Sequence, residues 1–151
     1  DLYKRQECEW LDAHDPDRTG FDLGHMTFTS DAGTCTSKGR SPDQAMMLAI
    51  SFVGLLDGLK TLVAGSAKDH LFVGVDSSFS LRFKRAKKGR IAIQCGTASL
   101  GEVESDELCR AILEGVESFM ARPESALPPG DAARGDLEMS LREFRAAVPG
   151  M

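Results

Sequence analysis

An acidic turn near the N-terminus has the side-chain spacing of the first half of a calcium-binding loop. Such a loop takes oxygen ligands from positions one, three and five, a glycine at six and a bidentate glutamate at twelve. Asp15, Asp17 and Thr19 stand at the first three of these positions, and Gly20 follows at the sixth. Position twelve is Met26, which offers no carboxylate. The pattern therefore favours a plain acidic turn, and no metal is expected.

Cysteines and histidines are the other side chains that could bind a metal or act as nucleophiles. No two cysteines form a C-x-x-C pair, and no histidines have the H-E-x-x-H spacing. A nucleophilic pair such as Cys35 with His25 would have to be assembled by folding, and nothing local marks it as activated. Neither a catalytic residue nor a cofactor is predicted, although a small hydrolase or transferase with a spatially assembled site stays an alternative. The thiols are expected to be reduced and mostly buried: Cys8, Cys35, Cys95 and Cys109.

A short basic segment stands out in a chain whose formal net charge is −5. A basic hairpin can bind phosphates, with an affinity that falls steeply as salt rises. Its polar face lacks aromatic side chains that would stack on bases, since Phe79 and Phe83 belong to the apolar set. The acidic balance also disfavours nucleic acid as the partner. Nucleic-acid binding is kept as an alternative, through Arg82, Lys84, Lys87, Lys88 and Arg90.

Acidic side chains gather on the second predicted helix and its approach. Opposed charge patches on a small domain suit electrostatically steered association, so a cationic protein is the partner that the acidic surface fits. Carboxylates at the start of a helix also serve as caps and keep the surface hydrated. The residues predicted to contact a partner protein are Asp106, Glu107, Glu114 and Glu117.

The elements that must position these residues begin with a long apolar helix. Ser41 to Gln44 read as an N-cap, a first-turn proline, an acidic residue and a capping-box glutamine, and apolar residues then recur up to Val63. Gly65 is a natural C-terminal stop. Because the helix is apolar on nearly every side, it must be covered on several faces. It is predicted to be either the central core helix or one side of a homodimer.

Three short segments with alternating apolar residues follow and predict an antiparallel meander with one buried face. The predicted buried positions are Leu71, Val73, Val75, Phe79, Leu81, Phe83, Ile91, Ile93 and Cys95. A second, amphipathic helix is predicted to start at Ser105, whose hydroxyl can cap it, and to end before Pro123. Residues 123–135 read as a surface linker to a short terminal helix.

The first forty residues are predicted in less detail. Residues 2–13 could form a short helix that carries Trp10, and residues 26–29 could pair with 34–37 as a hairpin. With 151 residues, 42% of them hydrophobic, the chain is predicted to be one α+β domain, residues 1–151. Its fold class is a small antiparallel sheet packed on a long buried helix and a second amphipathic helix, with a short C-terminal helix. No stretch predicts a membrane span, and a cytoplasmic location is expected by default.

The segment from Ala45 to Met120 resembles the WapI-type immunity proteins of bacterial polymorphic toxin systems and related uncharacterised domains. The resemblance rests on the helix around residues 52–56, on His70–Val73 and Ser78–Phe83, and on the closing helix over 108–119. It implies an immunity or antitoxin-type protein that inhibits a toxin by binding it, and it transfers no catalytic residue. A secretion or assembly adaptor stays an alternative that composition does not separate from immunity.

Overall fold

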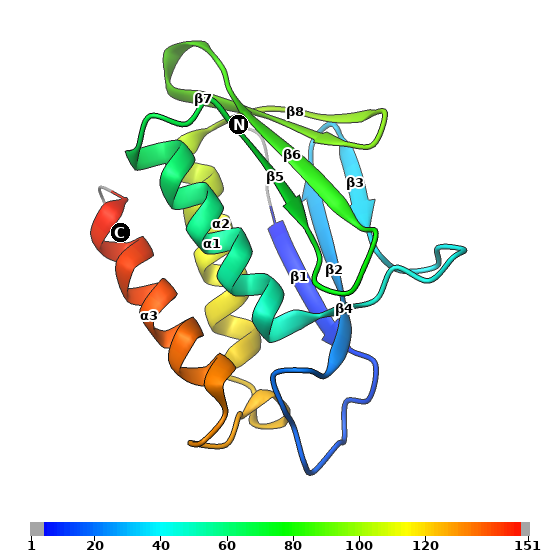
Figure 1. Ribbon diagram of the computed structural model, residues 1–151. Helices are drawn as coiled ribbons and strands as arrows, with labels where there is room; N and C mark the ends of the chain where they lie inside the picture. Colours follow the sequence, from blue (N-terminus) through cyan, green and yellow to red (C-terminus); the bar gives the residue numbers. More distant parts are fainter. Residues whose placement is uncertain (1–4, 149–151) are drawn as a thin grey trace.

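The computed structural model describes residues 5–148, which form an α+β fold of helices and antiparallel sheets. The helices lie on one side of the molecule and the strands on the other (Figure 1). The described α-helices are α1 (Leu48–Ala64), α2 (Ser105–Met120) and α3 (Ala132–Ala147). The predicted fold class is therefore confirmed, although a second sheet is present and the C-terminal helix is as long as α2.

Sheet A is built from β1 (Arg5–Trp10), β2 (Leu23–Ser30), β3 (Gly33–Thr36) and β4 (Met46–Met47). Its order is β1-β2-β3, with β4 also paired to β2. The predicted hairpin is confirmed, because Phe28 lies opposite Cys35. The predicted helix over residues 2–13 is wrong where the structure describes it. Residues Gln6, Cys8 and Trp10 are buried in alternation, and this period of two is that of a strand.

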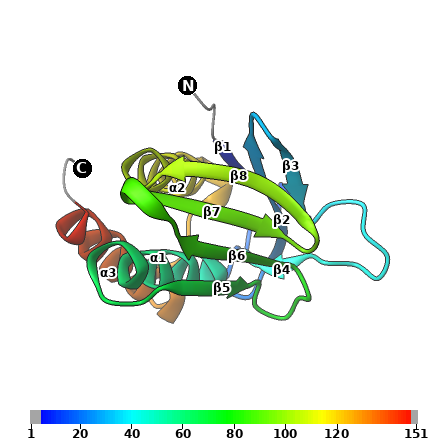
Figure 2. The same ribbon diagram turned by 90° about the horizontal axis from the view of Figure 1, so that it is seen from above.

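Sheet B has the order β5-β6-β7-β8, and its strands run across those of sheet A (Figure 2). The strands are β5 (Asp69–Val73), β6 (Ser80–Arg85), β7 (Arg90–Cys95) and β8 (Ala98–Glu104). The predicted meander is confirmed, and β8 adds a strand that the sequence did not predict. The predicted buried face of β5 is wrong. Leu71 and Val73 are 45% and 48% exposed, and Phe72 points to the core instead.

Helix α1 begins at Leu48, seven residues after the predicted cap at Ser41. A helix that began at Ser41 would use the N–H groups of Met47 and Leu48 in its own hydrogen bonds, but these groups are bonded to other segments. The Met47 N–H donates to Val75 O, and the Leu48 N–H donates to Asp22 O. The prediction that α1 is covered on several faces is confirmed within this chain, because α2, α3 and β5 all pack on it.

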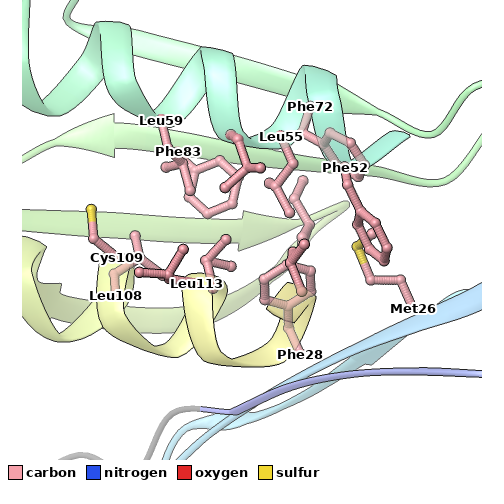
Figure 3. Close-up of a cluster of buried hydrophobic side chains, with 14 of the residues drawn as sticks. Met26, Phe28, Phe52, Leu55, Leu59, Phe72, Phe83, Leu108, Cys109 and Leu113 are labelled. Atoms are coloured by element: carbon pink, nitrogen blue, oxygen red, sulfur yellow. The ribbon is translucent and has the colours of Figure 1, made fainter. Parts of the chain in front are cut away.

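The core is continuous across both sheets and all three helices. Side chains from α1 and α2 face each other with Phe83 of sheet B among them (Figure 3). Phe28 of sheet A meets Phe83 edge-on, with ring centres 6.4 Å apart. The predicted terminal helix packs against α1, and Lys60 Nζ lies 2.9 Å from Glu143 Oε1.

Candidate protein-binding groove

A surface groove of about 630 Å³ lies between β1 and α2. It contains two of the four predicted partner contacts, Glu114 and Glu117. Its walls include Arg5, Gln6, Glu7, Glu114, Glu117 and Arg122. The remaining predicted contacts, Asp106 and Glu107, lie in the first turn of α2. There a carboxylate interacts favourably with the positive end of the helix dipole.

The edge of β1 is held against α2 at Gly115. The Leu11 N–H donates to Leu23 O, so the alternating bonds of the ladder place residues 5, 7 and 9 toward β2 and residues 6, 8 and 10 away from it. The Gln6 carbonyl accordingly lies over Gly115, where an added Cβ would be 2.5 Å from it. The missing side chain is what lets the helix cover the strand edge.

Gln6 contributes an unsatisfied polar atom to the wall of the groove. The residue is 3% exposed, and its Nε2 donates to Cys8 Sγ at 3.1 Å. Among the described residues its Oε1 has no hydrogen-bond partner. An unpaired buried acceptor costs about 1–3 kcal/mol. A small movement of this amide toward a donor in the groove would recover part of that free energy.

Charges of both signs line the groove, and one carboxylate is left available. Arg5 Nε lies 2.8 Å from Glu7 Oε1, and Glu117 forms an ion pair with Arg145 of α3. The Arg122 guanidinium lies over the Phe119 ring, 5.2 Å from its centre. Within residues 5–148, exposed Glu114 forms no ion pair, so it is the residue best placed to meet a cationic group.

The described thiols are poorly suited to nucleophilic chemistry. Cys8 borders the groove, but burial raises its pKa far above the ordinary value. Burial also raises the pKa of Cys109 to about 12. Both side chains are therefore protonated at neutral pH and are weak nucleophiles.

The prediction that all four cysteines are reduced is wrong. Cys35 and Cys95 form a disulfide between β3 and β7, across 60 residues of sequence. The hypothetical nucleophilic pair of Cys35 with His25 is thereby ruled out in this oxidised state. His25 Nδ1 lies instead 2.9 Å from Ser37 Oγ.

The basic hairpin presents a mixed surface. Arg82 Nη1 lies 3.3 Å from Asp69 Oδ2, and Arg90 stands opposite Glu104 in the ladder. Lys84 lies in register with Asp69 of the neighbouring strand. Lys87 and Lys88 are exposed in a 3₁₀ helix, Lys87–Gly89, at the tip. The predicted nucleic-acid residues therefore share one side of sheet B, with carboxylates interleaved among several of them.

The predicted calcium ligands lie in the loop between β1 and β2. The Asp17 N–H donates to Asp15 Oδ1, and the Thr19 hydroxyl donates to Asp22 Oδ1. The buried Arg18 guanidinium occupies the interior of the loop and donates to Asp22 Oδ2 at 2.8 Å. In the described part of the chain, no group of three or more His, Cys, Asp or Glu residues is arranged to hold a metal.

Comparison of the chain with protein-family models, with curated proteins and with solved structures gives no match. No residue role is therefore transferred from a relative, and the groove is assigned from its own contacts. None of the described helices is long and apolar enough to cross a membrane.

Proposed function

We propose that the protein is a non-catalytic protein-binding module, an immunity or antitoxin-type inhibitor whose groove between β1 and α2 receives a partner toxin. The observation that carries the proposal is a large groove with two polar groups that have no partner within residues 5–148. The exposed Glu114 carboxylate forms no ion pair there, and the buried Gln6 Oε1 accepts no hydrogen bond there. These groups recognise hydrogen-bond donors and cations. The adjacent thiol, Cys8, is held in its protonated form, which favours binding over catalysis.

A cationic segment of the partner is the chemistry that the groove favours. The formal net charge of −5 attracts such a protein during encounter, and charges near the rim act mainly on the association rate. Binding would inhibit the toxin by covering its active site or its substrate channel. The association should weaken as salt rises, because rim charges are screened.

The test starts from affinity capture of the tagged protein from its host, followed by purification of the captured protein. Its affinity is then measured by calorimetry with wild type and with Glu114→Lys. Reversal of this charge should raise Kd by about tenfold or more, equivalent to about 1.4 kcal/mol. Glu102→Lys on sheet B is the matched control, since it makes the same charge change outside the groove and should leave Kd unchanged.

Inhibition is measured separately, as the toxic activity of the captured protein with and without its inhibitor. Equal loss of affinity in both variants would contradict the assignment of the groove, and so would an unchanged affinity in both. A captured protein whose activity is unaffected by binding would contradict the inhibitor function. Recovery of nucleic acid, abolished by Lys87→Glu and Lys88→Glu, would favour the basic hairpin as the functional surface instead.

A further inference from the structure

The outer edge of β5 carries unpaired backbone groups. The Gly74 N–H donates to Phe79 O, and the Arg85 N–H donates to Lys68 O. In the antiparallel ladder these bonds place the backbone of even-numbered residues toward β6. The N–H and C=O groups of Asp69, Leu71 and Val73 consequently point away from the sheet, where the described residues provide no partner. The free stretch ends at Val75, whose N–H donates to Ser51 Oγ and whose carbonyl accepts from Met47.

Two other strand edges in the described structure are covered by their own chain. Helix α2 covers β1 at Gly115, as described above. Strand β8 lies against sheet A, where the Ser30 hydroxyl donates to Leu100 O at 2.8 Å. Strand β5 instead forms the outer border of sheet B (Figure 2).

The side chains along this edge are apolar and exposed. Leu71 and Val73 are 45% and 48% exposed on the outer face. Their neighbour Asp69 is already paired with Arg82, so this carboxylate is compensated within the chain. Exposed apolar edge strands pair readily with another strand, and proteins usually cover or charge them. This edge therefore selects an apolar strand rather than a charged segment.

We infer that β5 is the docking edge for a second copy of this chain, joined by antiparallel strand addition about a two-fold axis at Leu71. The free groups of Asp69, Leu71 and Val73 are symmetric about Leu71, so an identical strand matches every donor with an acceptor. About six backbone hydrogen bonds result. Leu71 then meets Leu71 of the second copy, and Val73 meets Asp69. The two B sheets become one continuous sheet, and the groove on sheet A stays open.

The test is the mass of the full chain in solution, measured by light scattering and sedimentation over a wide range of concentration. Wild type should change from monomer to dimer as concentration rises. Leu71→Lys places like charges opposite each other across the axis and should weaken the dimer by tenfold or more. Leu11→Lys is the matched control, because Leu11 is also exposed, at 54%, but lies off the edge. It should dimerise as wild type does.

The register is tested by cross-linking. Leu71→Cys should form a covalent dimer with a short bis-maleimide, whereas Val73→Cys and Gln94→Cys should not. The native free thiols do not compete, since Cys8 and Cys109 are buried. Circular dichroism confirms that each variant is folded. The proposal is overturned if wild type stays monomeric throughout, if Leu71→Lys dimerises unchanged, or if Val73→Cys cross-links in place of Leu71→Cys.

Discussion

His70 gives the folded state a dependence on pH. Its imidazole packs against Gly58 of α1, and within the described residues its Nε2 is buried without a hydrogen-bond partner. Burial lowers the pKa of His70 below its ordinary value of 6.5, and Asp69 opposes this only in part. Unfolding therefore takes up a proton below pH 6.5. The free energy of unfolding should have its full value above pH 6.5 and should decrease as the pH falls toward the pKa of His70 in the folded state.

Urea unfolding at a series of pH values measures this effect, with His70→Gln as the comparison because glutamine does not titrate. As the pH falls below 6.5, the free energy of unfolding of wild type should decrease relative to that of His70→Gln. A difference that stays constant over this range would contradict the assignment to His70.

Arg18 shows why single residues are the hardest part of the structure to predict from sequence. It lies in an acidic turn that the pattern describes correctly, yet it is only 4% exposed. Its guanidinium lies 4.1 Å from the centre of the Trp10 ring and donates to Glu124 O at 2.8 Å. Glu124 belongs to the predicted surface linker, 106 residues away. No local pattern of residue types reports a contact of that range.

At the scale of elements, the junction of α2 with β1 depends on Gly115. Alanine there gains about 1 kcal/mol of helix propensity. However, its Cβ would overlap the Gln6 side-chain oxygen and lie 2.5 Å from the Gln6 backbone oxygen. Overpacking of this kind costs about 1–3 kcal/mol. Gly115→Ala should therefore lower the free energy of unfolding by roughly 1 kcal/mol, after the gain in propensity is included.

The matched control is Gly54→Ala in α1, where no atom lies within 4 Å of the added Cβ. Because helix propensity acts there without a clash, Gly54→Ala should stabilise the protein by about 0.5–1 kcal/mol. Denaturant unfolding of both variants gives the comparison. Opposite signs are expected, and stabilisation by both substitutions would mean that α2 does not depend on a close approach to β1.

Elements with strong periodicity were predictable, whereas their ends and faces were not. The apolar repeat of α2 and the alternation of β6 and β7 are confirmed. The start of α1 was misplaced because Met46 and Met47 pair with β2, a tertiary contact that overrides the capping signal at Ser41. Leu71 and Val73 were assigned to the core because alternation identifies two faces without saying which is buried.

The sequence predicts the candidate groove only in part, because its walls come from segments that are far apart in the chain. Glu114 and Glu117 were identified from charge, and both line it. Its other wall is β1, a segment whose strand character was missed. The two walls meet where Gln6 contacts Gly115, two residues that are far apart in the sequence. Charge patterns locate a surface, but its shape depends on long-range packing.

At the scale of the whole molecule, the Cys35–Cys95 disulfide joins two sheets, whereas the sequence predicts a single sheet. The wide spacing of the cysteines predicts reduced thiols, but spacing carries no information about which side chains meet in space. Disulfides of this kind persist in oxidising compartments. A cytoplasmic location is expected only by default, and the Cys35–Cys95 bond lends it no support.

The disulfide should also contribute strongly to stability. A cross-link over 60 residues restricts the unfolded chain, and the entropy lost corresponds to about 4 kcal/mol at 25 °C. Reduction, or Cys95→Ser, should lower the free energy of unfolding by up to this amount, whereas reductant should leave the stability of Cys95→Ser unchanged. Thiol labelling in urea should detect only Cys8 and Cys109 before reduction and all four cysteines after it. Labelling of all four before reduction would show that the bond does not form, and the two sheets would then be held by packing between residues such as Phe28 and Phe83.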